Sequence, residues 1–292
     1  MKLTPMLASW ATSVPEVDEG EWIYEPKWDG LRALVRIDDD LKVRVLSRRG
    51  QALSRPLPEL AAMGATIGRS VVLDGEIVAL DGDGRPSYDR LAARLYASRP
   101  ERVARATPVT FVAFDVLQVD GEPLIDQPWW LRRDVLTGLA WPGGAAVATM
   151  ASDDGDALAS ATARLGLEGV MCKRRRARYV CGRRTGAWIK VKHPHAGWFD
   201  VVGWRPESKS HPQGALVLAD EERPAGTATM ALSPEHRFVL AQFVERHGAQ
   251  YGPLIRVPHG AQVRVHYGER SPRGFVRDAI AHEIRPALPG SA

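Results

Sequence analysis

Hydrophobic residues alternate with polar ones, or run unbroken over short stretches, through much of the first 190 residues. Such stretches are typical of strands that face a core on one side or on both sides. The predicted strands are 21–27, 31–37, 42–46, 71–80, 109–119, 169–173 and 187–192. Three aspartates at 38–40 favour a turn between the second and third strands, and Asp-Gly-Asp-Gly at 81–84 favours another after the fourth.

Helical periodicity is confined to three shorter segments of this part of the chain. Ser87 is suited to cap a helix that reaches about residue 98, with Leu91 and Leu95 on one face. Pro128 suits the first turn of a second helix, and the alanine-rich residues 156–165 predict a third. Because strands and helices do not alternate regularly, the pattern indicates an α+β fold of antiparallel sheets with helices.

The predicted secondary structure changes near residue 195, from mixed strands and helices to mostly short strands. His-Pro-His-Ala-Gly at 193–197 indicates a connector, and short predicted strands follow at 199–205, 215–219, 227–232 and 262–267. A single helix is predicted at 234–247, capped by Ser233 and ended by Gly248. Roughly 95 residues of short strands with one helix match a small β-barrel such as the OB-fold. We therefore expect two domains, at residues 1–195 and 196–292.

Composition narrows the class of protein. A hydrophobic fraction of 45% and a charged fraction of 25% are ordinary for a soluble globular chain. The sequence has no run of 18 apolar residues and no secretory signal, so we expect a cytoplasmic protein without membrane contact. A net charge of +4 favours polyanionic partners. Cys181 with His193 and His195 is an alternative set of metal ligands, although their spacing suits a linker better.

Six short motifs follow one another in a fixed order between residues 25 and 192. They are KWDGLR at 27–32, SRRG at 47–50, LDGEI at 73–77, FVAFD at 111–115, EGVMCK at 168–173 and WIKVK at 188–192. The first resembles the nucleophile motif K-x-D-G-x-R of the covalent nucleotidyltransferases, which comprise DNA ligases, RNA ligases and mRNA capping enzymes. The others resemble the remaining motifs of that superfamily. Together they are most similar to the small bacterial ATP-dependent DNA ligases associated with end joining.

The resemblance implies an adenylyltransferase (ATP-grasp-like ligase) domain, followed by an OB-fold domain. It implies that Lys27 is the nucleophile that accepts AMP from ATP, with Lys190 and Lys192 as further catalytic residues. Asp29 and Glu168 would bind Mg²⁺ or Mn²⁺. The residues implied to contact the nucleotide are Glu25, Arg32, Arg48, Glu76, Phe114, Met171, Lys190 and Lys192.

The residue types suit that chemistry on physical grounds. Alternation along a strand places Asp74 and Glu76 on one face, and likewise Lys190 and Lys192. Like charges on one buried face are costly unless an opposite charge answers them, and a nucleoside triphosphate with a divalent metal answers both pairs. Neighbouring cations also favour the neutral amine that a lysine needs in order to attack phosphorus. Asp74 is better suited to a structural hydrogen bond than to direct ligand contact.

The densest positive charge lies at 173–178, KRRRAR, and continues at 183–184. We predict that Arg174, Arg175, Arg176 and Arg183 contact DNA phosphates, with a solvated surface as the alternative reading. The implied partner is duplex DNA with nicks or broken ends, with end-joining or repair proteins as further candidates and the nucleoid as the cellular site.

The C-terminal region departs from the family pattern. Family ligases usually end in a motif of arginine followed by Asp-Lys, which orients the pyrophosphate leaving group. This sequence offers Arg277 and Arg285 without a clear Asp-Lys pair, so both arginines are candidates for that task.

The prediction is an ATP-dependent DNA ligase that seals 5′-phosphate/3′-hydroxyl breaks in duplex DNA through a lysyl-AMP intermediate, in DNA repair. RNA ligase and a GTP-using mRNA capping-type enzyme are alternatives that share the Lys27 chemistry. A non-catalytic nucleic-acid-binding protein on the same scaffold is a third alternative. The intact Lys27, Glu76 and Glu168 argue against it.

Overall fold

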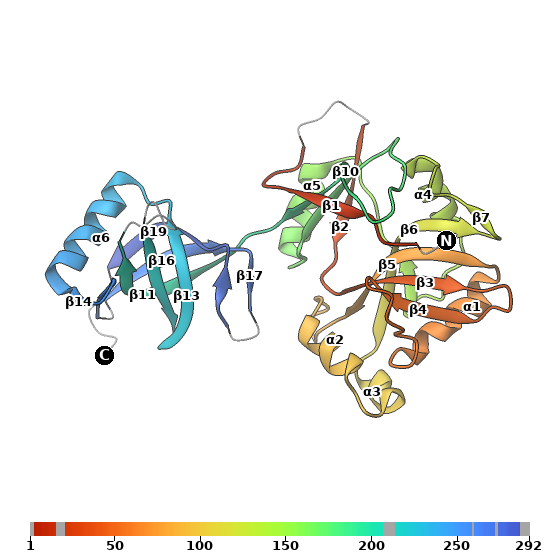
Figure 1. Cartoon of the computed structure of the whole chain (residues 1–292), viewed down its shortest axis with the longest axis horizontal. Helices are drawn as coiled ribbons and strands as arrows, with labels where there is room; N and C mark the ends of the chain where they lie inside the picture. The colour runs from red at the N-terminus through yellow and green to blue at the C-terminus, as the bar shows by residue number, and fades with distance from the viewer. Residues whose placement is uncertain (1–2, 16–20, 207–213, 259, 272–273, 287–292) are drawn as a thin grey trace. The chain divides into compact units, whose positions relative to one another are not determined.

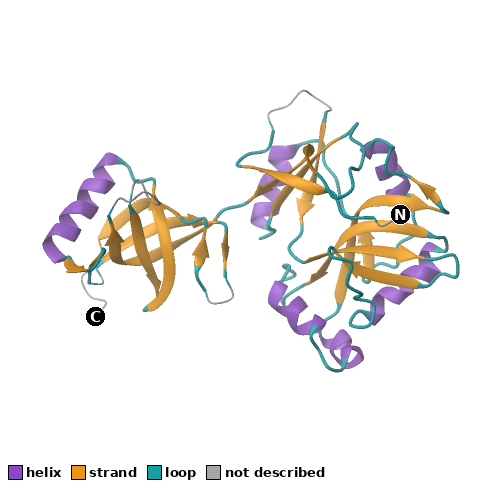
Figure 2. Ribbon diagram, viewed as in Figure 1, coloured by secondary structure: helices purple, strands orange, loops and turns teal. Residues whose placement is uncertain are grey.

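The computed structural model describes residues 3–15, 21–206, 214–258, 260–271 and 274–286 (Figure 1). The chain divides into two compact units, residues 1–193 and 194–292. The first unit combines strands and helices, whereas the second is rich in strands with one helix (Figure 2). Among the described residues, no helix is long and apolar enough to cross a membrane.

Two sheets form the first unit. One has the strand order β1-β10-β9-β2, and the other has the order β4-β3-β5-β6-β7 with β8 beside β6. Their strands are β1 Leu7–Ala11, β2 Trp22–Lys27, β3 Leu31–Ile37, β4 Val43–Ser47, β5 Val71–Ala79, β6 Val109–Val119, β7 Glu122–Pro123, β8 Ala146–Ala148, β9 Gly169–Arg174 and β10 Arg184–Lys192. Most neighbouring strands are antiparallel, as predicted, but β1 with β10 and β6 with β8 are parallel. The sheets are therefore mixed.

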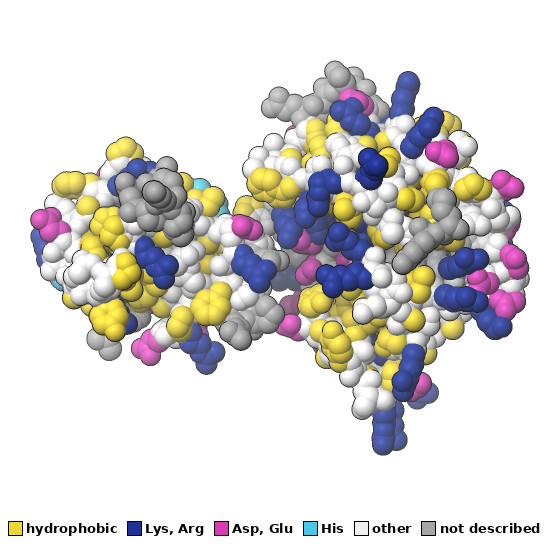
Figure 3. Space-filling view, viewed as in Figure 1, with side chains coloured by type: hydrophobic (Ala, Val, Ile, Leu, Met, Phe, Trp, Pro, Cys, Tyr) yellow, Lys and Arg dark blue, Asp and Glu magenta, His cyan; other side chains and the backbone are white. Residues whose placement is uncertain are grey.

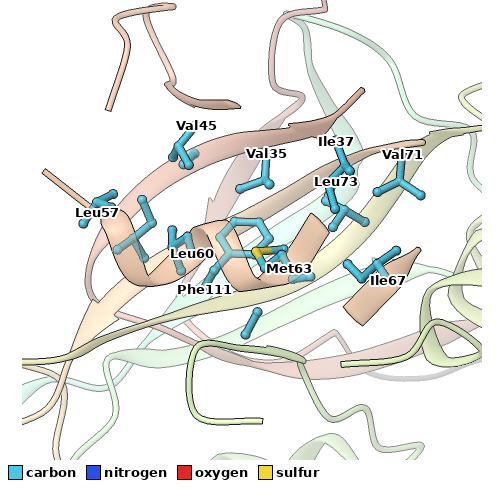
Figure 4. Close-up of a cluster of buried hydrophobic side chains, with 14 of the residues drawn as sticks. Val35, Ile37, Val45, Leu57, Leu60, Met63, Ile67, Val71, Leu73 and Phe111 are labelled. Carbon is cyan, nitrogen blue, oxygen red and sulfur yellow. The ribbon is translucent and has the colours of Figure 1, made fainter. Parts of the chain in front are cut away.

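Helices cover one face of the larger sheet. They are the short 3₁₀ helix η1 Pro58–Ala61, α1 Ala62–Ile67, α2 Tyr88–Leu95, α3 Pro100–Ala106, α4 Trp129–Thr137 and α5 Gly155–Arg164, the last of which packs on β9 and β2 instead. Alternate residues of β3 and β5, such as Val35 and Leu73, point into the main core, where Met63 of α1 and Phe111 of β6 meet them (Figure 4). Gly75 lets Phe111 approach, because a Cβ there would lie 2.4 Å from the ring.

The opposite face of the larger sheet joins it to the smaller one. Leu34, Val72 and Leu117 point to this face and pack with Tyr179 and Trp188. Polar residues that alternate with the core positions of β3 and β5 are thereby brought to the junction of the two sheets, where the candidate site lies.

The second unit contains nine strands and helix α6, counted over its described residues. They are β11 His195–Arg205, β12 Ala215–Asp220, β13 Arg223–Met230, α6 Pro234–His247, β14 Ala249–Tyr251, β15 Leu254–Arg256, β16 Ala261–Tyr267, β17 Glu269–Arg270, β18 Val276–Arg277 and β19 Ile280–Pro286. Because β11 pairs with both β12 and β16, the strands β12-β13-β19-β16-β11 close into a five-stranded ring. Alternate residues such as Phe199, Val201 and Val263 fill its interior.

Several predicted bounds agree with the structure, and some do not. The strands predicted at 31–37 and 109–119 and the helix at 234–247 are confirmed residue for residue, with Ser233 as the N-cap. The helix predicted from Ser87 ends at Leu95 rather than near 98. The connector predicted at 193–197 is wrong from His195 onward, because His195 begins β11 and lies opposite Tyr267 of β16.

Candidate active site

A cavity of about 210 Å³ lies at the junction of the two sheets of the first unit. Figure 3 shows Lys and Arg side chains gathered over a hollowed face of this unit. The lining residues come from seven strands and from the turns after β2 and β4: Leu7, Ala8, Glu25, Pro26, Lys27, Trp28, Arg32, Arg48, Glu76, Phe114, Met171, Lys173, Arg184, Trp188 and Lys190. Segments as far apart in the sequence as Leu7 and Lys190 therefore share one cavity.

Most of the predicted nucleotide-binding residues lie in this cavity. Those that line it are Glu25, Lys27, Arg32, Arg48, Glu76, Phe114, Met171 and Lys190. Lys192 is joined to the group through Glu168, which also contacts Lys27. Asp29 is exposed in the turn between β2 and β3 and is absent from the lining, as are the predicted DNA-contacting arginines.

Glu168 holds two of the predicted catalytic lysines together. Lys27 Nζ donates to Glu168 Oε2, and Lys192 Nζ lies 2.8 Å from Glu168 Oε1. Both lysines lie opposite Gly169 in the sheet, one on each neighbouring strand. Burial raises the pKa of Glu168, but the ammonium groups of Lys27 and Lys192 outweigh burial, so its net pKa is lowered. The carboxylate therefore stays ionised between two cations.

The geometry around Gly169 explains why glycine stands beside Glu168. Its φ of +155° belongs to the region that favours glycine, and a Cβ would lie 2.0 Å from the Val191 carbonyl oxygen. Replacing Gly169 would push β10 away and would separate Lys192 from Glu168.

Arg32 is fixed by a buried carboxylate beneath the cavity. Its Nε and Nη2 donate to the two oxygens of Asp74 at 3.0 and 2.6 Å, and Tyr179 donates its hydroxyl to Asp74 at 2.6 Å. Asp74 is fully buried. This bidentate pairing supports the interpretation of Asp74 as a structural hydrogen-bonding residue that orients Arg32 toward the cavity.

Two other cavity residues have shifted pKa values. Burial raises the pKa of Glu76 to about 8, although Lys27 and Arg32 oppose the change. Burial also lowers the pKa of Lys190, and the neighbouring charges of Lys27 and Lys192 lower it further. Shifted groups that gather in one cavity are typical of functional sites.

Lys173 lines the cavity, whereas the sequence placed it only at the start of the basic tract predicted to contact DNA. Its ammonium lies 2.7 Å from Glu25 Oε2 and donates to the Phe114 carbonyl oxygen at 2.9 Å. A signal was available: Lys173 follows Met171 by two positions on β9, so both side chains point to the same face. Trp28 and Trp188 were assigned no site role and Arg184 was counted only in the basic tract, but all three line the cavity.

The predicted metal ligands are two carboxylates rather than a dense cluster. The described residues contain no group of three or more His, Cys, Asp or Glu that could hold a metal, so the alternative set around Cys181 is not formed among them. Carboxylate oxygens suit Mg²⁺ and Mn²⁺, and Mg²⁺ is commonly held by one or two carboxylates together with substrate phosphates. Asp29 and Glu168 thus fit such an ion by donor chemistry.

The arginine tract divides into paired and unpaired members. Arg174 forms an ion pair with Glu21 and stacks over Trp22 at 4.6 Å, and Arg175 forms an ion pair with Asp153. Arg176 and Arg183 are exposed. No ion pair is found for either within the part of the chain that the structure describes.

In the second unit, Arg285 is held in place on the outer face of the ring. Its Nε and Nη2 donate to Gln262 Oε1 at 3.1 and 2.7 Å, and its guanidinium lies 4.0 Å from the Trp198 ring centroid. Gln262 in turn donates to Asp200 at 3.0 Å. Arg277 is exposed on β18.

Comparison with known proteins agrees with this geometry. Residues 5–192 match the protein family described as the ATP dependent DNA ligase domain. The chain is 31% identical over 303 residues to the multifunctional non-homologous end joining protein LigD of Mycobacterium bovis, covering 97% of this chain and 38% of that protein. It is 34% identical over 225 residues to DNA ligase C1 of Mycolicibacterium smegmatis, covering 74% of this chain and 64% of that protein.

A solved structure shows the same fold. A mycobacterial DNA ligase D complexed with ATP and MES matches with a TM-score of 0.59 and 28% identity, covering 98% of this chain and 96% of that chain. The family match spans more than half of the sequence and includes all six motifs. The chain therefore belongs to the ATP-dependent DNA ligase family.

Proposed function

We propose that this chain is an ATP-dependent DNA ligase that attaches AMP to Lys27 and seals 5′-phosphate/3′-hydroxyl breaks in duplex DNA during end-joining repair. The observation that supports it is the convergence of Lys27, Lys192 and Glu168 beside a cavity lined by residues predicted to bind the nucleotide. The chain spans 38% of the length of the LigD protein to which it is similar, so the proposal concerns only the region that the two proteins share.

The cavity suggests a place for each part of ATP. Phe114 and Met171 would lie against the two faces of adenine, since aromatic stacking on bases is favourable by about 1–3 kcal/mol. Glu25 would accept a hydrogen bond from the base, and Glu76 would bind the ribose. Arg32, Arg48, Lys190 and Lys192 would face the phosphates, where cations stabilise developing negative charge.

The residues around Lys27 suit a nucleophile. In the proposed first step, Lys27 Nζ forms a bond to the α-phosphorus of ATP, the bond to pyrophosphate breaks, and the amine proton passes to solvent. Lys27 lines the cavity, so its amine is placed beside a nucleotide bound there. AMP then passes to the 5′-phosphate of the broken strand, and attack by the 3′-hydroxyl on that phosphate releases AMP.

Asp29 and Glu168 would hold a divalent cation, Mg²⁺ or Mn²⁺. Such an ion would neutralise charge on the phosphates during transfer. Glu168 also contacts Lys27 and Lys192, so this carboxylate would serve the cation and the two lysines at one place.

The two units suggest two domains with different roles. We assign residues 1–195 to an adenylyltransferase domain and residues 196–292 to an OB-fold domain, because the closed five-stranded ring with one helix matches that architecture. Arg176 and Arg183, with Arg174 and Arg175, would contact DNA phosphates. Repair proteins would be further partners at the nucleoid.

The decisive experiment separates nucleotide and substrate class. The protein is incubated with ATP, GTP or NAD, each labelled in the phosphate retained on lysine, and then resolved by denaturing electrophoresis. We expect label from ATP alone, and we expect none with Lys27→Ala, while Lys42→Ala at an exposed site serves as a matched control with full labelling. Joining is then assayed on nicked duplex DNA and on nicked RNA. Labelling of the Lys27→Ala variant, or a preference for GTP, would refute the proposal.

A further inference from the structure

The hydroxyl of Tyr179 begins a buried series of hydrogen bonds that reaches the cavity. Tyr179 lies in the loop between β9 and β10 and is 3% exposed. Its oxygen accepts from the backbone N–H of Met6 at 2.9 Å, and its hydroxyl donates to Asp74 Oδ2 at 2.6 Å. A hydroxyl has one proton to donate, and Met6 brings a donor of its own. The proton of Tyr179 is therefore committed to Asp74.

The carboxylate of Asp74 passes this constraint to Arg32. Asp74 Oδ2 accepts from both Tyr179 and Arg32 Nη2, and Asp74 Oδ1 accepts from Arg32 Nε at 3.0 Å. Two parallel bonds hold a guanidinium and a carboxylate in one plane, but the two groups can still turn together. The bond from Tyr179 comes from a different segment of the chain, so it fixes the orientation of the pair.

The ring of Tyr179 makes a separate contribution. It packs edge-on against Trp188, with 5.6 Å between the ring centroids and 84° between the planes. The Arg32 guanidinium carbon in turn lies 5.6 Å from the Trp188 ring centroid. Phenylalanine at position 179 keeps this ring packing and removes the hydroxyl alone, so the two contributions can be separated.

Arg32 has donors to spare for a ligand. A guanidinium carries five N–H donors, and Asp74 takes two of them. Arg32 lines the cavity, whereas Tyr179 and Asp74 are absent from its lining. Burial, assisted by the charge of Asp74, raises the pKa of Tyr179 well above its ordinary value, so the hydroxyl keeps its proton.

We propose that Tyr179 is a positioning residue, whose hydroxyl fixes Asp74 and thereby directs the remaining donors of Arg32 at the phosphates of bound ATP. This inference deepens the proposed function and rests on it. Tyr179 is buried outside the cavity lining, so its hydroxyl acts on the nucleotide through Arg32.

The first test compares ATP with adenosine, which lacks the phosphates. Binding is measured by calorimetry on the full chain carrying Lys27→Ala, so that no transfer occurs. Misplacing one charged hydrogen bond should weaken ATP binding about tenfold in Tyr179→Phe and change adenosine binding less than about twofold. A merely structural role would weaken both ligands by the same factor, and that result would overturn the proposal.

The second test asks whether Tyr179 acts through Arg32. Arg32→Lys keeps a cation beside the buried Asp74 but removes the planar fork that the carboxylate orients. In the Arg32→Lys background, Tyr179→Phe should therefore change ATP binding less than about twofold, because residues that act as a unit are not additive. The same tenfold loss in both backgrounds would show that Tyr179 acts independently of Arg32, and would overturn the proposal.

Two control variants separate positioning from stability, with thermal melting recorded for each protein. Tyr96→Phe removes a hydroxyl from a residue that is 89% exposed, and it should retain the binding of both ligands. Val72→Ala removes volume from the buried cluster that contains Tyr179 without removing any of its hydrogen bonds. It should lower the melting temperature and keep the ATP:adenosine affinity ratio of the parent protein. A ratio altered as much as in Tyr179→Phe would overturn the proposal.

Covalent labelling of the wild-type protein keeps this inference distinct from the proposed function. If ATP labels Lys27 but Tyr179→Phe weakens ATP and adenosine equally, the inference fails and the proposed function stands. If ATP leaves the wild-type protein unlabelled, the proposed function fails and the inference fails with it.

Discussion

The two units of this chain place their charges in opposite ways. The polar and charged side chains found buried among the described residues all belong to the first unit: Glu25, Asp74, Arg94, Asp115, Arg132, Thr149, Thr162 and Lys173. The second unit has an apolar core, and its ion pairs lie on the surface, such as Arg264 with Glu283, which are 51% and 47% exposed. Buried charge is thus concentrated in the unit that contains the cavity.

In the first unit, buried charges orient side chains around the cavity, whereas the second unit is organised mainly by apolar packing. Burying ions is costly, and it is tolerated where their orientation serves a site. Arg32 with Asp74, and Lys173 with Glu25, both fix side chains that line the cavity. The apolar ring of the second unit provides a stable frame, and its outer face is available for polar contacts.

The largest expected effect comes from breaking a buried ion pair of the first unit, and it is compared with breaking an exposed ion pair of the second unit. Arg132 donates to Asp115 through Nε at 2.7 Å and Nη2 at 2.8 Å, with both side chains buried. Asp115→Asn should lower the free energy of unfolding by about 3–5 kcal/mol, because it leaves Arg132 buried without its counter-charge. Glu283→Gln, which breaks the exposed pair with Arg264, should cost less than about 1 kcal/mol. Urea unfolding curves check both values, and equal losses would contradict the contrast between the units.

A second prediction concerns two charged residues on the surface of the second unit, Arg285 and Arg277. Resemblance assigns the orientation of pyrophosphate to a basic residue near the C-terminus, and Arg285 is already held by Gln262 and Trp198. We therefore expect Arg285→Ala to slow self-adenylation by about 100-fold or more, the usual effect of removing one charge-stabilising contact. Arg277→Ala should have the smaller effect.

The control for this prediction is a nick that already carries AMP. Joining it involves no pyrophosphate, so Arg285→Ala should slow this step much less than self-adenylation. A fragment of residues 1–193, tested in the same two assays, should show the same asymmetry. Equal losses in both steps would mean that the second unit acts mainly by holding DNA.

Much of the fold was accessible from the sequence, for a physical reason. β3, β6 and α6 have strong local periodicity, so their bounds follow from their own residues. β1 was not predicted, because Leu7–Ala11 has no clear alternation and is a strand through its pairing with β10. β19 was missed for the same reason, since the ring closes around it only when β13 and β16 are in place.

The candidate site shows the same contrast between residues predicted from local motifs and contacts that depend on the tertiary structure. The motifs predicted the residues that line the cavity, including Glu76 and Phe114, because each motif fixes a local spacing. They did not predict that Lys173 pairs with Glu25, since that contact depends on the diagonal approach of two strands. Nor did charge density reveal that Arg174 and Arg175 would be paired with distant acidic residues.

The third prediction concerns this arginine tract. Arg176 and Arg183 are exposed, whereas Arg174 and Arg175 are paired with acidic side chains. Changing Arg176 and Arg183 together to Ala should reduce the slope of log affinity for duplex DNA against log salt by roughly two. The Arg174→Ala/Arg175→Ala variant serves as the comparison and should change the slope less. An unchanged slope in both variants would identify the tract as a solvated surface.

The last prediction is a pH dependence set by Glu76. Its pKa in the folded protein is raised to about 8 by burial, above an unfolded value near 4.5. Between these values the folded state binds more protons than the unfolded state, so stability falls as pH rises. We expect the melting temperature of the nucleotide-free protein to fall by roughly 7–14 °C between pH 5 and pH 8 through this group, since the linkage amounts to about 3.5 kcal/mol. Glu76→Gln should flatten that profile, and a profile as steep as that of the wild type would refute the assignment.

The parallel pairing of β1 with β10 has a consequence for the order in which the protein is made. Residues Leu7–Ala11 leave the ribosome before their partner strand Arg184–Lys192, which emerges about 175 residues later. At about 5–20 residues per second, β1 would wait roughly ten to thirty-five seconds for its neighbour. During that interval, the cavity lacks the wall that carries Lys190. A nascent chain would thus gain nucleotide affinity abruptly, only once the first unit is complete.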